Sequence, residues 1–252
     1  LRGAIFGVVS GLTVLARPEG IMLVGIIGLV MMIVQPQGNF RQVFLYGCAS
    51  IIAFVLTLSP YLLLNLQLTG GVLPNTATAK FQQHAVLLQL PYLTRVKNMI
   101  VPLLPGGQLL LIPGMIGFVW MSYRHSGSRS VLVFLIPLMW AGALVLLYAA
   151  RLPADYQHGR YVIPALPSLV LAGVIGMLYL VDRAKYQMLP RVLTRALFAS
   201  AVLAQVAFAV VIAPPIYRTD VAIINEEMVA SAHWIEANIP REELLAIHDI
   251  GA

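Results

Sequence analysis

Long runs of apolar residues, separated by short polar segments, dominate this chain of 252 residues. A helix rises about 1.5 Å per residue and the hydrocarbon core of a bilayer is about 30 Å thick, so roughly 20 apolar residues can span it. Runs of about that length lie at 43–64, 99–121, 131–150, 161–181 and 196–213, and shorter runs at 3–16 and 20–34 flank the sequence RPEG. The pattern predicts an all-α polytopic membrane protein with about seven transmembrane helices.

Composition points to the same class. Hydrophobic residues make up 60% of the chain, charged residues 10%, and the mean hydropathy is +0.86, values far from those of soluble globular proteins. The single cysteine, Cys48, lies inside a predicted span, which excludes an internal disulfide and a cysteine-built metal site. The start of the chain at Leu1 has neither a basic segment nor a small-residue cleavage site, so we expect no signal peptide there.

The chain is strongly basic, with a net charge of +6 and a pI near 9.7. Its cations gather at the ends of the predicted spans and form neither a basic helix stripe nor a patch interleaved with aromatic residues. That distribution is not typical of nucleic-acid binding, so we expect no nucleic-acid partner. Membrane lipid phosphate is the expected anion.

The distribution of lysine and arginine also predicts the orientation, because these residues concentrate in short cytoplasmic loops. One predicted face holds Arg2, Arg41 and the segments YRHSGSRS and DRAKYQMLPRVLTR, and it is dense in cations and nearly free of acids. The other face carries as many cations, spread over longer loops. The density of charge assigns the first face to the cytoplasm and the second to the outside, for a multi-pass protein of the inner (plasma) membrane.

We predict two regions along the chain. Residues 1–213 form a transmembrane helical domain, whose outer-face loop at 65–98 contains an interfacial helix near 76–90 with Phe81 and Leu88 on its apolar side and Lys80 on its polar side. After Pro214 the hydropathy falls and acids become frequent, which predicts that 214–252 begins an extracytoplasmic soluble domain that appears truncated. There, Asn225 is expected to cap a helix, and ELLAIHDIGA to form the first strand of a small α/β segment.

The stretch DYQHGRYVIPALP, at 155–167, places polar side chains directly before an apolar span. Lipid offers no hydrogen bonds, so polar residues at such a position indicate a role on the aqueous side. The candidates are Asp155, Tyr156, His158, Arg160 and Tyr161.

Four segments together resemble the GT-C superfamily of membrane glycosyltransferases. They are LARPEG between two helices, LPNTATAKF in an outer loop, HGRYVIPALP before a span, and AHWIEANIPREELLAIHDIGA near the end. The resemblance is strongest to the bacterial branch around glycosyltransferase family 39 and to the terminal arabinofuranosyltransferases of mycobacterial cell walls. It covers most of the chain through short motifs.

The resemblance implies an enzyme that moves a sugar from a polyprenyl-phosphate donor to an acceptor glycan, lipid or protein on the outer face of the membrane. Negative charge builds on the leaving phosphate, so fixed cations stabilise the transition state. We expect Arg160, with Lys80 and Arg17, to bind the donor phosphate. The expected sugar or acceptor contacts are His158, Tyr161, Asp155, Tyr156 and Asn75.

The catalytic residue stays unassigned. Enzymes of this superfamily carry their catalytic acid in the first outer loop, and that part of the pattern has no counterpart here, so we expect the chain to correspond to the C-terminal part of the membrane region. No cofactor and no metal site is indicated, because Asp155 has no second ligand nearby, although a divalent cation stays open.

Each candidate also has a purely structural interpretation. Lys80 can extend its amine from the membrane to water, and Arg17 with Glu19 can form a charge pair that caps two helix ends. The outer-face tyrosines can form an aromatic belt. Two other functional classes also stay open: a transporter, which would need polar residues within the spans and broken helices in paired positions, and a non-catalytic assembly subunit. The prolines and glycines of VPLLPGGQLLLIPG do interrupt the predicted span at 99–121.

Overall fold

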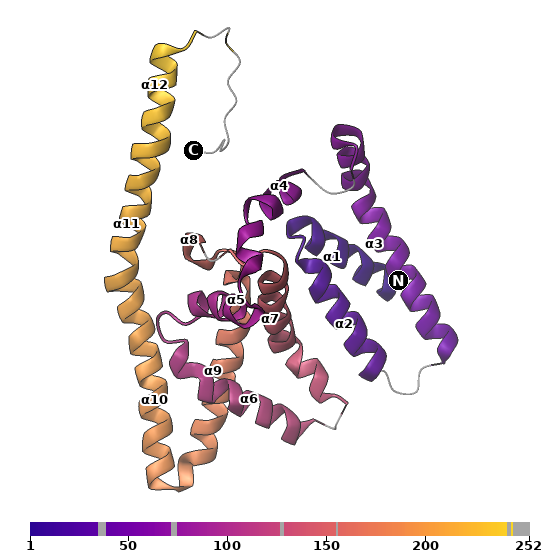
Figure 1. Ribbon diagram of the computed structural model, residues 1–252. Helices are drawn as coiled ribbons and strands as arrows, with labels where there is room; N and C mark the ends of the chain where they lie inside the picture. The colour runs from indigo at the N-terminus through magenta and orange to yellow at the C-terminus, as the bar shows by residue number, and fades with distance from the viewer. Residues whose placement is uncertain (35–38, 72–74, 127–128, 155, 241–242, 244–252) are drawn as a thin grey trace.

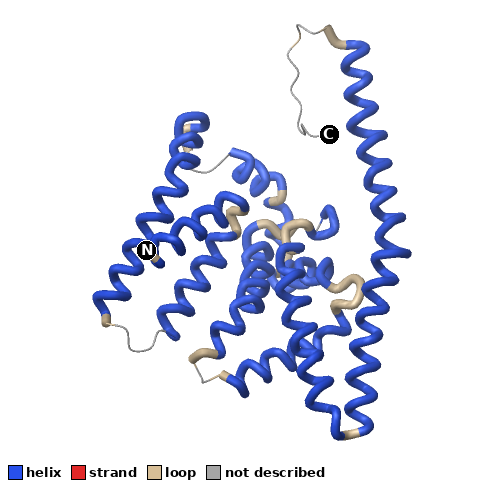
Figure 2. Tube along the Cα trace, turned by 180° about the vertical axis from the view of Figure 1, so that it is seen from behind, coloured by secondary structure: helices blue, strands red, loops and turns tan. Residues whose placement is uncertain are grey.

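The computed structural model describes residues 1–34, 39–71, 75–126, 129–154, 156–240 and 243, and within these ranges all regular structure is helical (Figures 1 and 2). The helices are α1 (Arg2–Ala16), α2 (Gly20–Val34), α3 (Phe40–Thr69), α4 (Asn75–Gln83), α5 (Tyr92–Ile100), α6 (Ile112–His125), α7 (Val131–Arg151), α8 (Tyr156–Gly159), α9 (Leu166–Arg183), α10 (Met188–Ala207), α11 (Ala213–Ile224) and α12 (Ala230–Asn238).

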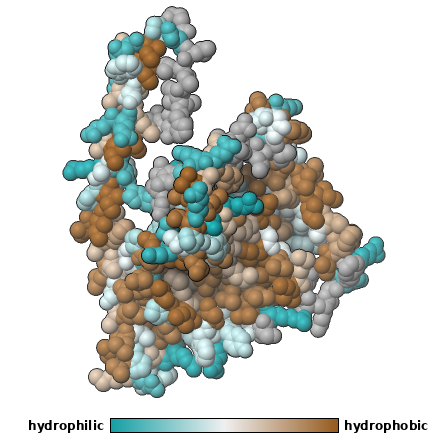
Figure 3. Space-filling view, viewed as in Figure 1, coloured by the Kyte–Doolittle hydropathy of each residue, from teal (hydrophilic) through white to brown (hydrophobic). Residues whose placement is uncertain are grey.

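Four helical stretches are long and apolar enough to cross a membrane: α3, α7, α9 with its flanking turns, and Met188–Asn238. The helices α1 and α2 are apolar but shorter. In Figure 3, apolar residues cover most of the visible surface of the bundle, and hydrophilic residues gather at its lower edge and along the upper part of the long helix. The chain is therefore an all-α membrane protein, as predicted, while the number of seven spans stays a prediction.

The helices run between two opposite ends of the bundle (Figure 1). At the upper end in this view, α1 is followed by α2, α3 leads toward α4, and α7 leads through α8 into α9. At the lower end lie the last turn of α6, the first turn of α7, and the connection from α9 to α10. The loops before α7 and after it therefore lie at opposite ends, as the sequence predicted.

Glycines let two helix pairs approach closely. On α1, a Cβ added to Gly7 would lie 2.2 Å from the carbonyl oxygen of Ser50 on α3. Between α6 and α9, a Cβ on Gly176 would lie 1.7 Å from the carbonyl oxygen of Gly114. No side chain fits at these distances, so glycine is required at both contacts, as is common where helices pack inside a membrane.

The predicted span at 99–121 is not one helix. The helix α5 ends at Ile100, a 3-10 turn follows at Val101–Leu103, and α6 begins only at Ile112. Pro102 and Pro105 lack the N–H that a continuous helix needs, and Gly106 adopts a left-handed φ of 75°. This part of the chain is therefore a broken hydrophobic segment.

The segment after Pro214 also differs from the prediction, because one helical stretch continues from Met188 to Asn238. A π-helical turn at Phe208–Ile212 directly precedes Pro214, and such a turn accommodates the missing N–H and the bulk of the ring. Asn225 lies inside the helix with φ −67° and ψ −42°, so it is not an N-cap. The predicted strand ELLAIHDIGA lies almost wholly outside the described residues.

The helix expected near 76–90 forms two shorter pieces, and its position at the membrane interface stays a prediction. The helix α4 ends at Gln83 and is followed by a 3-10 helix at Ala85–Gln89. The main core lies beside this region and joins α5, α7 and the turn before α9. It consists of Met99, Leu103, Ala141, Leu144, Val145, Ala149, Val162 and Ala165. This core fixes the upper ends of α7 and α9, where the candidate residues lie.

Candidate functional site

A hydrogen bond joins the two segments at the centre of the site. The hydroxyl of Tyr148, in the last turn of α7, donates to Oε1 of Glu19, in the turn before α2. The other carboxylate oxygen of Glu19 is buried and has no hydrogen-bond partner among the described residues. A buried carboxylate oxygen without a partner is unfavourable unless a ligand or water supplies a donor. The geometry therefore leaves an acceptor atom available at the upper end of the bundle.

Aromatic stacking extends this pair to the predicted phosphate-binding residue. The ring of Tyr148 lies 5.2 Å from the ring of Tyr161, measured between centroids, with the planes tilted by 30°. The guanidinium of Arg160 lies 5.2 Å from the centroid of the same Tyr161 ring. A cation over an aromatic ring is held without losing its charge. Glu19, Tyr148, Tyr161 and Arg160 thus form one cluster, which we call the upper cluster.

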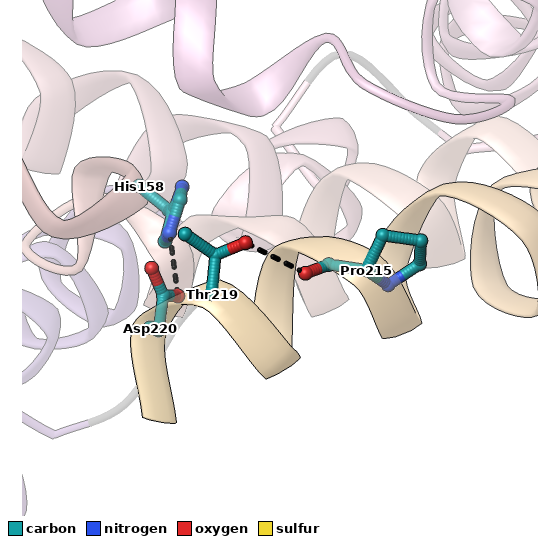
Figure 4. Close-up of polar contacts among 4 residues, drawn as sticks. All are labelled: His158, Pro215, Thr219 and Asp220. Carbon is teal, nitrogen blue, oxygen red and sulfur yellow. Dashed lines mark hydrogen bonds and ion pairs between the residues drawn. The ribbon is translucent and has the colours of Figure 1, made fainter. Parts of the chain in front are cut away.

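The turn at α8 approaches the long helix through His158. Nε2 of His158 lies 2.9 Å from Oδ2 of Asp220 on α11, a contact between exposed side chains (Figure 4). The hydroxyl of the adjacent Thr219 donates to the carbonyl oxygen of Pro215, about one turn earlier in α11, at 3.1 Å. The backbone of His158 has a left-handed φ of 56°, which is uncommon for a residue with a side chain. The Asp220 contact connects this turn to α11.

Arg95 of α5 contacts the last turn of α7. Its Nη1 donates to the carbonyl oxygen of Ala149 at 3.0 Å, and its guanidinium lies 5.3 Å from the centroid of the Tyr92 ring. The last carbonyls of a helix lack partners within the helix and carry partial negative charge, so a cation there is stabilising. Arg95 therefore positions the turn of α7 that carries Tyr148.

The structure brings some of the predicted site residues together and leaves others apart or undescribed. Arg160 and Tyr161 belong to the upper cluster, and His158 is in the neighbouring turn. Arg17 follows the last residue of α1, two residues before Glu19 in the sequence. Lys80 is half-buried on α4, and its approach to Arg17 and Arg160 stays a prediction. Asp155 lies outside the described residues, as do the side chains of Asn75 and Tyr156.

Sequence reasoning missed three features of this region. The sequence predicts Glu19 only as part of a charge pair with Arg17, and Tyr148 is one of the outer-face tyrosines expected to form an aromatic belt. Asp220 was placed in a soluble segment, but it contacts α8. The pattern gave one usable signal, a glutamate between two apolar runs, because an acid beside a membrane span is uncommon.

An apolar cavity of about 390 Å³ lies between α5, the turn after it, α6, α7 and α9. Its walls include Val96, next to Arg95, and Leu146, two residues before Tyr148. Gln108 also lines it, and its side-chain oxygen is buried without a partner among the described residues. The cavity can accept a hydrocarbon chain.

Among the residues that the structure describes, no group of three or more His, Cys, Asp or Glu side chains is arranged to hold a metal ion. Comparison of the chain with models of protein families, with characterised proteins and with solved structures found no match.

Proposed function

We propose that this chain is part of an integral-membrane glycosyltransferase. It transfers a sugar from a polyprenyl-phosphate donor to an acceptor glycan, lipid or protein, at the outer face of the inner (plasma) membrane. In this proposal the upper end of the bundle is the extracytoplasmic end, and the segment after Pro214 is also extracytoplasmic.

One observation carries the proposal. Two of the motifs on which the resemblance rests, RPEG and HGRY, are far apart in sequence, yet Glu19 of the first and Arg160 with Tyr161 of the second meet around Tyr148. Residues that converge at the end of a membrane bundle, where water and lipid headgroups meet, favour a binding site for a polar group attached to lipid.

The chemistry assigns a role to each charged member of the cluster. In the transfer, an acceptor hydroxyl forms a bond to the anomeric carbon and loses its proton, while the bond from that carbon to the phosphate oxygen breaks. Negative charge therefore grows on the departing polyprenyl phosphate, and the Arg160 guanidinium stabilises it. The unpaired oxygen of Glu19 accepts a hydrogen bond from a sugar hydroxyl. The apolar cavity along α5 and α7 takes the first part of the polyprenyl chain.

A transporter is the second candidate, and the break between α5 and α6 favours it. Transporter folds place broken helices in corresponding positions of two halves of the protein. Within the described residues, the four long candidate spans continue without such a break. The broken segment is therefore better explained as one wall of the apolar cavity.

The test is a transfer assay on membranes that contain the full-length protein, with a radiolabelled polyprenyl-phosphate sugar as donor. Glu19→Gln keeps the atom that accepts from Tyr148 and removes the charge, so transfer should fall on the order of tenfold or more if Glu19 contacts the sugar. Glu236→Gln, an exposed change on α12, is the matched control and should have no effect. Transport of a solute without any sugar transfer would establish the second candidate. If the protein showed neither transport nor transfer, a non-catalytic subunit would be the remaining interpretation.

A further inference from the structure

The opposite end of the bundle carries a polar pocket that the proposed transfer reaction does not use. It has a volume of about 740 Å³ and lies where α6 and α9 end and α10 begins. Its walls include the cations Arg183 and Lys185, the acid Asp182, and the rings of His125 and Tyr179. A pocket of this size at the end of a membrane bundle can hold the headgroup of a lipid.

The hydroxyl of Tyr179 indicates a missing ligand. It is buried and has no hydrogen-bond partner among the described residues. The ring of His125 packs edge-on against the Tyr179 ring at 5.9 Å between centroids, and Nδ1 of His125 donates to the Met121 carbonyl at 3.0 Å. A buried phenol hydroxyl normally has a partner, and a ligand oxygen in the pocket would supply an acceptor.

The charge at this end favours an anionic ligand. Lys185 forms an ion pair with Asp182 at 3.1 Å, so these two charges compensate each other. Arg183 lines the pocket, and Arg124 lies over the Trp120 ring at 5.0 Å, near the end of α6. Within the described part of the chain neither arginine has an acidic partner. Arg183, the arginine that lines the pocket, is therefore suited to binding a phosphate.

An apolar groove of about 430 Å³ continues from the polar pocket along the bundle. It shares Tyr179, Leu180 and Arg183 with the pocket. Its other wall is one face of α6, formed by residues at helical spacing: Pro113, Ile116, Gly117 and Trp120. Ile116 and Trp120 are 66% and 49% exposed, so the groove opens toward the surrounding lipid. A cationic pocket joined to a lipid-facing apolar groove matches a molecule with an anionic head and a hydrocarbon tail.

We propose that the cleft between the end of α6 and the end of α9 is a binding site for an anionic phospholipid of the adjacent leaflet. The phosphate lies in the polar pocket, with Arg183 as its main contact and the Tyr179 hydroxyl as a donor to a phosphate oxygen. One acyl chain lies in the groove against Ile116 and Trp120. The site is separate from the upper cluster and does not depend on the proposed transfer reaction.

Native mass spectrometry of the purified full-length protein tests the site, with phosphatidylglycerol, phosphatidylcholine and glycerol phosphate as probes. Phosphatidylglycerol should bind saturably and at least about tenfold more tightly than phosphatidylcholine, because only the former carries a net negative charge that the arginines can compensate. Glycerol phosphate should bind more weakly than phosphatidylglycerol, because it has no chain for the groove. Equal affinity for glycerol phosphate and phosphatidylglycerol would contradict binding of an acyl chain in the groove. Equal affinity for phosphatidylglycerol and phosphatidylcholine would overturn the proposal.

Variants separate a specific site from general attraction to a basic surface. Arg183→Ala should weaken phosphatidylglycerol binding about tenfold, and Tyr179→Phe should weaken it by a smaller factor while thermal stability is retained. Arg195→Ala removes a cation from α10 that lines neither cavity and should change little. Equal losses from Arg183→Ala and Arg195→Ala would show that only surface charge attracts the lipid. If Arg183→Ala failed to fold, unchanged binding to Tyr179→Phe would still contradict the site.

Discussion

The Tyr148 hydroxyl donates a hydrogen bond to the Glu19 carboxylate across 129 positions of sequence. This bond links the start of α2 to the end of α7, two helices that pack against each other. It satisfies one oxygen of Glu19 and leaves the other buried without a partner in the described residues. The same tyrosine ring stacks on Tyr161, so the bond positions both the free acceptor and the ring beneath Arg160.

Tyr148→Phe tests this bond. The change removes one hydrogen bond to a charged group and leaves Glu19 without its protein donor, so the free energy of unfolding should fall by about 1–3 kcal/mol. The stacking with Tyr161 needs only the ring and should persist. Thermal unfolding in detergent measures the loss. The double variant Tyr148→Phe, Glu19→Ala should be less destabilised than the sum of the two single variants, because each single change already removes the bond. If the losses of unfolding free energy of the two single variants simply added up in the double variant, the bond would contribute nothing to stability.

Arg160 is expected to matter more for transfer than for stability. Arg160→Lys keeps the charge and loses the two-pronged geometry, so turnover with a polyprenyl-phosphate sugar should fall. Arg160→Ala should lower it further, by the loss of a charged hydrogen bond worth roughly 1.5–3 kcal/mol, or on the order of tenfold to a hundredfold. Expression and membrane insertion should stay unchanged for both variants.

Arg151→Ala is the matched control, since Arg151 is an exposed arginine at the end of α7, close to the same region. Its turnover should stay within about twofold of the unmodified protein, as is usual for an exposed charge. If both alanine variants had equally small effects, the stretch DYQHGRYVIPALP would be an interfacial anchor and the phosphate-binding role of Arg160 would be wrong.

The sequence predicted those parts of the fold that depend on local composition. Apolar length gave the helices α3, α7 and α9, and the RPEG turn gave the boundary between α1 and α2. Apolar length alone is insufficient where backbone chemistry decides. Prolines and a left-handed glycine interrupt the predicted span at 99–121, whereas the prolines at 214–215 do not end the long helix, because a π-helical turn absorbs them. Hydropathy does not distinguish these two outcomes.

The candidate site was predictable to a similar extent. Arg160 and Tyr161 were identified from polar residues placed before a span, which is a local signal. The contacts between distant segments were not identified: Tyr148 of α7 packs against Tyr161, Glu19 bonds to Tyr148, and Asp220 of α11 contacts His158. Sequence alone gives no register between helices, so such long-range pairs appear only in the folded chain.

Helix packing at glycine gives a prediction with a sharp control. Gly176→Ala places a methyl group 1.7 Å from the Gly114 carbonyl oxygen, so α6 and α9 must separate and the protein should lose several kcal/mol of stability. Gly142→Ala, inside α7, adds a Cβ that meets nothing within 4 Å and should be neutral or stabilising by up to about 1 kcal/mol. Thermal unfolding of the two variants side by side measures the difference. Equal melting temperatures would contradict the close contact.

The turn at His158 is predicted to tolerate asparagine better than a branched residue. Its left-handed φ of 56° is accessible to asparagine but unfavourable for valine, by about 1–2 kcal/mol. His158→Asn should therefore unfold at a higher temperature than His158→Val.

The contact of His158 with Asp220 is between exposed side chains, so Asp220→Asn should lower the free energy of unfolding by less than about 1 kcal/mol. A large loss from Asp220→Asn would show that this contact fastens α11 to the bundle.

Arg95 connects the stability of α7 with the proposed function. Arg95→Ala leaves the carbonyl of Ala149 without its charged donor and should lower the free energy of unfolding by about 1.5–3 kcal/mol. Arg95→Lys should recover only part of this, because a lysine cannot keep the planar stacking on Tyr92. Since the same turn of α7 carries Tyr148, transfer by Arg95→Ala should fall even at temperatures where the protein is fully folded.

Lys97→Ala, an exposed change on the same helix, is the control and should leave both stability and transfer unaltered. If Arg95→Ala melted at a lower temperature but transferred sugar at the normal rate when folded, Arg95 would stabilise α7 without positioning Tyr148.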